Sequence, residues 1–508
     1  MPHSTVDEGP VRAQEQSLPE VLRSLLRLRW SQLAALSFFL AGIGAVAFRK
    51  KFFVIDPDVW WHLKVGDWIV AHIAVPHNGI LSHTAANRPW VAYSWGYEVL
   101  LSRAYAWGGL VGIGVFGGLL TVAVAFAIYW MLHRLSGRFW ASLIGTGIVC
   151  SAFLFDGSPR PFFFSVALFA LILTLLLQAQ RSVRFAPLYW LPLIFLFWAN
   201  LHIQFIYGLF LVGLYVGISV LQRLACVLGF ESRFLVPPTL PVGKLVAIFI
   251  GCILATLAGP NFYHPYVSVY EYSQAKFTYS VIIELQPLSF RYVSQYTELL
   301  IAAAGFYAVG WQKKLDPFKL SLLAIASAVA FRTQRDGWFI CLSAAACIAD
   351  FPAAEVESDR LASWTEAAGV AMAVAILLLL ALGPTDMTQR GLDRAISAEY
   401  PVNAINFLRR NPVPGPLYNN LNWGGFLMWY MPQYPVAIDG RNDLYGDDLD
   451  KVFYDVQSAE ESYLTDRYLN ESGVVLLDSK LPLAKILTID PRFRLIYHDD
   501  IATVYAHR

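Results

Sequence analysis

The chain has 508 residues, of which 56% are hydrophobic and 15% are charged, and its formal net charge is +1. Because a soluble globular domain carries about 25% charged residues, this composition excludes an ordinary soluble protein. The apolar residues form long blocks, which is typical of a polytopic α-helical membrane protein. The five cysteines lie in or beside these blocks, and their spacing indicates neither a metal site nor a disulfide framework.

The apolar blocks predict about eleven membrane spans, several of them shorter than the roughly 20 residues of an untilted crossing. No small-residue cleavage site follows the first block, so we expect it to be retained as a helix. The polar residues before it, 1–18, are expected to be disordered. The spans lie near residues 31–48, 110–132, 139–155, 161–180, 186–200, 203–222, 243–258, 297–311, 317–331, 337–350 and 365–383.

Lysine and arginine residues predict the orientation of the chain. Three arginines precede the first span and place the N-terminus in the cytoplasm: Arg23, Arg27 and Arg29. With alternating spans, ten further Lys and Arg residues fall in short loops that are predicted to be cytoplasmic. We therefore expect a cytoplasmic segment at 1–30, a membrane domain at 31–384 and a soluble extracytoplasmic domain at 385–508. Two long segments of the membrane domain then face outward, the first outer loop (49–109) and the second outer loop (259–296).

The first outer loop contains the stretch DPDVWWHLKVGDWI, which predicts a short helix. Asp56 suits the N-cap of this helix and Pro57 its first turn. Asp58, Trp61 and His62 then share one helix face, although the tryptophans are also explained as interfacial anchors. Charge at the rim of a membrane is costly unless it is solvated, paired or used. Asp58 therefore either stabilises the helix through its dipole or belongs to a site.

Further acidic residues fall in the predicted outer segments. Glu98 lies in an expected interfacial helix at the end of the first outer loop, and Asp156 lies in FDGSPRP between the third and fourth spans. Glu284 lies in SVIIELQPLSF of the second outer loop, where a surface glutamate near a turn-forming proline is one interpretation that stays open. Three polar residues at the outer end of the fifth span either line a groove or, as we favour, satisfy hydrogen bonds within the bundle: Asn200, His202 and Gln204.

Three arginines stand at helix ends on the predicted outer face, against the charge rule: Arg160, Arg332 and Arg335. Each alone is explained by a side chain that reaches toward lipid head groups. Together they could form a positive surface for a phosphate group at the membrane boundary. Both interpretations stay open.

The tail after residue 385 changes character. GVVLLDS, YPVAIDG, FRLIYHD and IATVYAH are typical of strands, and PVNAINFLRR and the stretch around 449–468 are typical of helices. We expect a small α/β domain here. In its middle, Asn422, Trp423 and two glycines form an NWGG block that suits a tight turn.

The order and predicted membrane side of these motifs resemble the membrane glycosyltransferases of the GT-C fold, most closely the catalytic subunits of oligosaccharyltransferases. DPDVWWHL resembles the start of that family's first outer loop. SVIIELQP resembles its glutamate motif, which is commonly followed by Gln-Pro, and AFRTQRDG resembles its arginine segment near the donor pyrophosphate. The chain is also similar to uncharacterised bacterial multi-spanning proteins that share the WWHL and NWGG…IDGRxDLY motifs. The resemblance covers nearly the whole topology.

The resemblance implies that Asp58, with Asp56 as the alternative, binds a divalent metal such as Mg²⁺ or Mn²⁺ and activates the acceptor. It implies that Glu284 binds the metal and the acceptor. Asp156 corresponds to the first member of the family's acidic pair and would be a further metal ligand, whereas Ser158 replaces the second member. The metal site is therefore expected to be incomplete, reshaped or absent.

The resemblance also implies a donor site. Arg332 or Arg335 would contact the donor phosphate, joined by Arg160. Trp61 and His62 on the first helix, and Trp423 in the NWGG block, are expected to contact substrate. The block lacks the acidic centre of the family's Trp-Trp-Asp-Tyr-Gly motif, which puts recognition of an Asn-x-Ser/Thr sequon in doubt.

We therefore expect a bacterial inner-membrane glycosyltransferase that moves a sugar from a polyprenyl-phosphate-linked donor to an extracytoplasmic acceptor. Its expected partners are this donor and the lipid bilayer, and no nucleic acid. A transporter of lipid-linked saccharides would favour ionisable groups at the bilayer midplane and repeats with broken helices, which the sequence does not show. A non-catalytic GT-C-like scaffold in envelope polysaccharide assembly stays open because of Ser158 and the altered block. Convergence of Asp58, Asp156 and Glu284 would favour the enzyme.

Overall fold

The computed structural model describes residues 28–49, 51–154, 158, 160–230, 234–351 and 388–508. The polar N-terminal segment, the predicted span near 365–383 and Asp156 lie outside the described residues.

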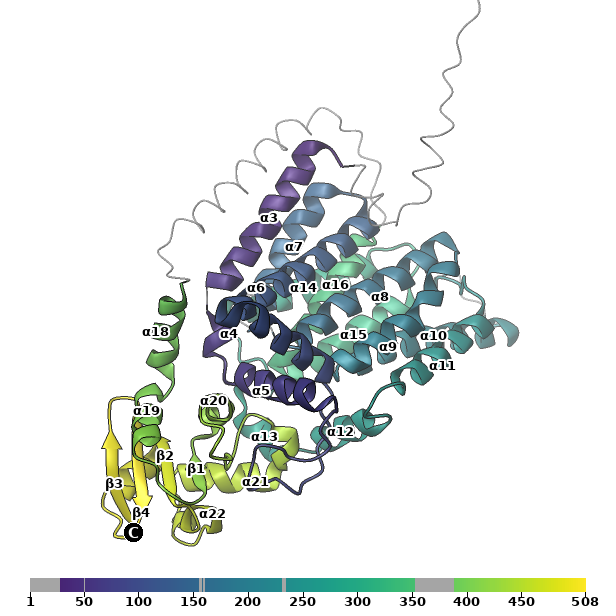
Figure 1. Cartoon of the computed structure of the whole chain (residues 1–508). Helices are drawn as coiled ribbons and strands as arrows, with labels where there is room; N and C mark the ends of the chain where they lie inside the picture. Colours follow the sequence, from purple (N-terminus) through teal and green to yellow (C-terminus); the bar gives the residue numbers. More distant parts are fainter. Residues whose placement is uncertain (1–27, 50, 155–157, 159, 231–233, 352–387) are drawn as a thin grey trace, which may run out of the picture.

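A bundle of apolar helices forms the body of the molecule (Figure 1), and each helix overlaps a predicted span. The bundle comprises α3 (Trp30–Arg49), α6 (Trp95–Ser136), α7 (Phe139–Phe153), α8 (Phe162–Ser182), α9 (Leu191–Leu201), α10 (Phe205–Val227), α11 (Val242–Thr256), α14 (Val293–Gly310), α15 (Pro317–Arg332) and α16 (Gly337–Ala349). Four stretches of the described chain are long and apolar enough to cross a membrane: Trp30–Ile55, Trp95–Ser136, Phe162–Ser182 and Phe205–Val227. The polytopic helical membrane fold predicted from the sequence is confirmed.

Helix α6 is broken where the first outer loop joins the bundle. Gly109 has φ 58° and ψ −142°, a backbone conformation that glycine adopts far more readily than other residues. The part before this break carries Glu98 and is the helix that the sequence predicts at the end of this loop. It packs closely on α5 (Pro57–His72), since a Cβ atom added to Gly66 would lie 2.0 Å from the Glu98 carbonyl oxygen.

The C-terminal residues form a four-stranded sheet with the order β1-β2-β4-β3. Strands β1 (Leu417–Asn419) and β2 (Val474–Asp478) are parallel, and β4 (Ala502–His507) pairs antiparallel with β2 and with β3 (Phe493–His498). The helices of this C-terminal part are α18 (Gln389–Glu399), α19 (Val402–Arg410), α20 (Gly424–Tyr430), α21 (Asn442–Gln457), α22 (Arg467–Asn470) and α23 (Pro482–Leu487). The α/β character predicted for this region is confirmed.

One predicted strand, YPVAIDG, does not join the sheet. The Asn419 side chain takes the hydrogen bonds that a neighbouring strand would otherwise make: its Oδ1 accepts from the Ala437 N–H at 2.8 Å, and its Nδ2 donates to the Ile438 carbonyl at 2.8 Å. Val436 instead forms an isolated bridge with Ser82 of the first outer loop. This segment therefore ties the C-terminal part to the loop.

Short elements of both outer loops lie between the bundle and the sheet (Figure 1). They are α4 (Phe52–Ile55), α5, α12 (His264–Ser273), α13 (Lys276–Val281) and the turn η2 (Ile283–Leu285), joined by the turn η3 (Gln334–Asp336) that follows α15. Trp60 of α5 anchors the C-terminal part, because its ring packs edge-on against Phe426 and Tyr430 at centroid distances of 5.1 and 5.4 Å. The buried Trp60 also contacts Tyr400 at 6.0 Å.

Candidate active site

The site begins at the N-terminus of α5. Asp56 is the N-cap residue, and its carboxylate accepts a hydrogen bond from the backbone N–H of Asp58 at 3.0 Å. Pro57 occupies the first turn, where its missing N–H leaves no helical carbonyl without a partner. The predicted cap is confirmed, and it fixes where the Asp58 side chain leaves the backbone.

Arg160, just before α8, brings three carboxylates together. Its Nε and Nη2 donate to the two oxygens of Asp56 at 2.6 and 2.8 Å. Its Nη1 lies 3.0 Å from Asp58 Oδ2 and 3.5 Å from Glu284 Oε1. Glu284 belongs to the second outer loop, so a single guanidinium joins the two loops. The predicted convergence of Asp58 and Glu284 is found here, whereas Asp156 lies outside the described residues.

A second arginine binds Glu284. Arg335 Nε and Nη2 both donate to Glu284 Oε2, at 3.1 and 3.0 Å. Gln334 fixes this pair, because its backbone N–H donates to the Gln286 carbonyl at 3.0 Å and its side chain donates to the Ile283 carbonyl at 3.3 Å. The turns η2 and η3 therefore hold carboxylate and guanidinium side by side. We call Arg160 with Asp56, Asp58, Glu284 and Arg335 the Arg160 cluster.

The cluster contains one of the two arginines that the sequence left as alternatives for the phosphate-binding residue. Arg335 is part of it, whereas Arg332 ends α15 and makes no ion pair with any carboxylate in the part of the chain that the structure describes. Side-chain exposure rises from 4% at Asp56 to 49% at Glu284. A substrate would therefore approach from the side of Glu284 and Arg335.

Asp58 shares its helix face with the two aromatic residues predicted for it. Trp61 Nε1 donates to Asp58 Oδ1 at 3.1 Å. The His62 ring stacks on Trp61 with centroids 3.5 Å apart, and His62 Nδ1 lies 3.2 Å from Glu98 Oε1. His62 is buried, and its pairing with Glu98 joins α5 to α6. Trp61 is thus the residue that contacts the cluster directly, and His62 supports it from behind.

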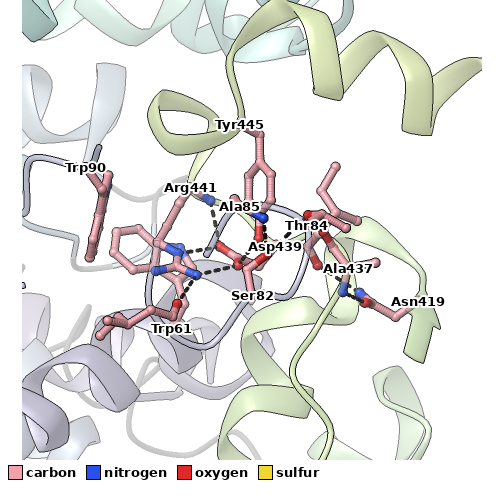
Figure 2. Close-up of polar contacts among 12 residues, drawn as sticks. Trp61, Ser82, Thr84, Ala85, Trp90, Asn419, Ala437, Asp439, Arg441 and Tyr445 are labelled. Atoms are coloured by element: carbon pink, nitrogen blue, oxygen red, sulfur yellow. Dashed lines mark hydrogen bonds and ion pairs between the residues drawn. The ribbon is translucent and has the colours of Figure 1, made fainter. Parts of the chain in front are cut away.

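The C-terminal part closes the other side of Asp58. Figure 2 shows Arg441 bound to Asp439, with Nε and Nη2 donating to the two carboxylate oxygens at 2.8 Å each. Arg441 Nη2 also donates to the carbonyl of Ile80 in the first outer loop at 2.9 Å, and its guanidinium lies 4.8 Å from the Trp90 ring centroid. A Cβ atom added to Gly440 would lie 2.3 Å from Asp58 Oδ1. The backbone between Asp439 and Arg441 therefore touches the carboxylate itself.

Three neighbouring aspartates of α21 hold both outer loops. Asp443 Oδ2 accepts from the Trp90 indole at 3.0 Å, and Asp448 pairs with Arg88 of the same loop. Asp447 caps α13 in the second outer loop by accepting from the backbone N–H groups of Phe277 and Thr278 at 2.7 and 3.0 Å. Since α13 precedes the turn that carries Glu284, α21 helps to set the position of that carboxylate.

Burial and nearby charges shift the pKa values of the three carboxyl groups in different directions. Burial raises the pKa of Asp58, and the nearby charge of Asp56 adds to the rise, while Arg160 only partly opposes it. Burial also acts upward on Asp56, but Arg160 outweighs it and leaves the pKa of Asp56 below its ordinary value. Glu284 follows Asp56, because Arg160 and Arg335 together hold its pKa low. Among these three carboxyl groups, Asp58 is therefore the one best suited to exchange a proton.

These carboxylates do not fit a divalent cation in this arrangement. Such an ion needs several oxygens at about 2.0 to 2.6 Å, and the inward oxygens already bind the Arg160 guanidinium. Among the described residues, no group of three His, Cys, Asp or Glu side chains is placed to hold a metal. The predicted ligands Asp58 and Glu284 thus converge, but on an arginine.

No protein-family model matches the chain, and no curated protein matches its sequence. Solved structures match over nearly all of it. The oligosaccharyltransferase of Archaeoglobus fulgidus, tethered to an acceptor peptide containing the NVT sequon, matches with a TM-score of 0.54 at 11% identity, over 96% of this chain and 75% of that one. The chain has the fold of an oligosaccharyltransferase.

The apo form of the same archaeal protein matches with a TM-score of 0.52 at 12% identity, over the same shares of the two chains. ArnT from Cupriavidus metallidurans bound to undecaprenyl phosphate matches with a TM-score of 0.45 at 12% identity, over 92% of this chain and 97% of that one. The GT-C fold predicted from the motifs is confirmed as a fold.

Within this fold, Trp423 and Asn200 both lie in packed positions. Trp423 is buried, and its indole donates to the Glu399 carbonyl at 3.3 Å, a placement that favours packing over contact with a substrate. Gly425 next to it lies against α5, since an added Cβ would meet the Pro57 carbonyl oxygen at 2.8 Å. Asn200 accepts from the Trp95 indole at 2.9 Å, as expected for a residue satisfied within the bundle.

The residues that join the C-terminal part to the loops were not predicted from the sequence. Asp439 and Arg441 are fully buried, and with Asp447 they set the position of the Arg160 cluster. The signal was present in the IDGRNDLYGDD run, where many charged residues follow a strand-like segment. The role of these charged residues could not be predicted, because the groups that they bind lie in the two outer loops, far earlier in the sequence.

Proposed function

We propose that this protein is a membrane glycosyltransferase that moves a sugar from a polyprenyl-phosphate-linked donor to an acceptor hydroxyl or amide on the outer face of the membrane. One observation carries the proposal: Asp58 and Glu284, from two separate outer loops, meet at one guanidinium beside a second arginine. Local folding alone does not require this convergence, whereas sugar transfer needs a base and cations at one place.

In the proposed reaction Asp58 is the general base. Its raised pKa and its place at the start of α5 suit a carboxylate that accepts the acceptor proton. Arg335 stabilises the negative charge that develops on the leaving phosphate, as a bidentate guanidinium does well. Glu284 orients Arg335 and contacts the acceptor, because it is the most exposed carboxylate of the cluster. The fold of the solved oligosaccharyltransferase supports the general class of this reaction.

The test is transfer by the full chain in lipid nanodiscs, with radiolabelled polyprenyl-phosphate and polyprenyl-pyrophosphate sugars and a membrane extract as the source of acceptor. Asp58→Asn should reduce transfer by at least about 100-fold, as for a lost general base. Asp67→Asn is the matched control, because Asp67 lies on the same helix, is 52% exposed and pairs only with the nearby Lys64 among the described residues. It should transfer at the parent rate.

Two outcomes would count against the proposal. Full transfer by Asp58→Asn would remove Asp58 from the reaction. Absence of transfer by the parent protein with every donor would favour the scaffold interpretation, which the binding of Asp56, Asp58 and Glu284 by Arg160 also supports.

A further inference from the structure

Arg160 occupies the position at which a divalent cation would have to bind these carboxylates. We propose that its guanidinium replaces the metal ion, and that the protein transfers sugar without a divalent cation. This inference rests on the proposed function for its activity arm. The test has a second part, a metal-binding measurement, which asks only which cation the three carboxylates bind and does not depend on the proposed function.

The first argument is geometric. The Arg160 fork binds both oxygens of Asp56, and its third nitrogen lies between Asp58 and Glu284. A cation that bound the same inward oxygens would have to displace the guanidinium. Asp56 opposes this displacement, because its side chain is 4% exposed and is fixed as the cap of α5. Asp56, which anchors Arg160, is thus itself fixed by its hydrogen bond to the backbone of α5.

The second argument is charge. The three carboxylates carry three negative charges, and Arg160 and Arg335 contribute two positive charges to the same cluster. A divalent ion added to this cluster would face two guanidinium groups within the range of strong repulsion. An arginine guanidinium also stays protonated at every physiological pH. The cluster therefore has a permanent internal cation.

The chemistry is complete with this cation. The acceptor heteroatom forms a bond to the anomeric carbon of the sugar, and the bond between that carbon and the phosphate oxygen breaks. The bonding electron pair leaves with the phosphate oxygen, and the acceptor proton passes to Asp58. Arg335 neutralises the leaving phosphate, while Arg160 keeps Asp58 and Glu284 at a fixed separation. No further reactant is required.

The binding arm measures Mn²⁺ by electron paramagnetic resonance and by thermal shift on the full chain in detergent. The parent protein should bind no Mn²⁺ at the cluster and show no shift. Arg160→Met removes the guanidinium and keeps the length of the side chain, so the three freed carboxylates should now bind Mn²⁺ and raise the melting temperature. Arg335→Met is the matched control, since it leaves Arg160 in place. It should bind no Mn²⁺ at the cluster and show no thermal shift.

The activity arm measures transfer by the parent protein with EDTA and with added Mg²⁺ or Mn²⁺, and the rate should not change. Loss of transfer in EDTA with recovery in Mn²⁺ would overturn the inference, as would Mn²⁺ binding by the parent protein that Asp58→Asn abolishes. Parent protein that neither transfers nor binds Mn²⁺ would refute the proposed function while the cation replacement stands. If Arg160→Met does not fold, the parent measurements still decide between the outcomes.

Discussion

At the scale of single residues, Asp58 is held between opposing influences. Burial and the neighbouring carboxylates favour its neutral form, whereas Arg160 and the Trp61 indole favour the carboxylate. A group in this balance changes its pKa when any one partner is removed. The partners of Asp58 can therefore be tested one at a time.

Trp61→Phe should move the acidic limb of the pH profile of kcat/KM to higher pH. The base must be ionised, so activity falls as the pH drops through the pKa of Asp58, which already lies above its ordinary value. Loss of the indole hydrogen bond removes a group that stabilises the carboxylate and raises this pKa further. Trp68→Phe on the same helix is the control and should leave the limb in place. A limb that stays or moves to lower pH in Trp61→Phe would contradict the role of Asp58.

Asp56→Ala should destabilise the protein by more than the about 1 kcal/mol expected for a lost helix cap. Asp56 also binds Arg160, and loss of one partner from a buried ion pair costs roughly 3 kcal/mol or more. Asp56→Asn keeps a capping oxygen and should lose mainly the ion-pair contribution. Equal unfolding free energies for Asp56→Ala and Asp56→Asn would show that the cap contributes nothing.

The pH dependence of this contribution has a defined sign. Because the folded-state pKa of Asp56 lies below its unfolded value, its stabilisation is present above the unfolded pKa of about 3.9. It is lost as the pH falls further, through the lowered pKa of the folded state. The difference in unfolding free energy between the parent protein and Asp56→Asn should therefore shrink on acidification below about pH 4.

At the scale of elements, the features that depend on neighbouring residues in the sequence were predicted correctly. The cap and proline of α5, and the apolar length of the bundle helices, depend on neighbours in sequence and were predictable. The segment YPVAIDG has a strand-like pattern, but the Asn419 side chain takes its hydrogen bonds. The choice between Arg332 and Arg335 depended on Gln334 meeting Gln286 across two turns. These outcomes depend on long-range contacts that a single sequence does not contain.

Gly440→Ala should impair transfer while leaving the fold intact. The added methyl would lie 2.3 Å from Asp58 Oδ1 and 3.1 Å from Trp61 Nε1, so the carboxylate must move. A displacement of about 1 Å at a reacting group can reduce the rate about 100-fold. Gly217→Ala in α10 is the control, since a Cβ there meets nothing within 4 Å. Parent-level transfer by Gly440→Ala would show that the contact with the C-terminal part does not position Asp58.

At the scale of the whole molecule, the C-terminal part completes the site rather than standing apart from the membrane bundle. Asp439 to Arg441 contact the first outer loop, and Asp447 caps α13 of the second. The match to the archaeal oligosaccharyltransferase at 11% identity extends over 96% of the chain. The two proteins therefore share a fold over nearly all of this chain and over 75% of the archaeal chain.

The proposed orientation places this C-terminal part outside the cell membrane. Ile489→Cys, at a residue that is 84% exposed, should react with a membrane-impermeant maleimide without permeabilisation of the inner membrane. Lys313→Cys in a predicted cytoplasmic loop should react only after permeabilisation. Background labelling should be low, because Cys226 is half-buried and the other four native cysteines are buried. The reverse pattern would overturn the orientation.

The most direct test of the central claim is a cryo-electron microscopy structure of the protein in nanodiscs with a bound polyprenyl-phosphate sugar, prepared in EDTA. We predict that the phosphate binds within hydrogen-bond distance of Arg335, with Arg160 still between Asp56, Asp58 and Glu284, and the anomeric carbon facing Asp58. A phosphate bound away from Arg335, or a sugar on a surface that Asp58 does not reach, would contradict the account.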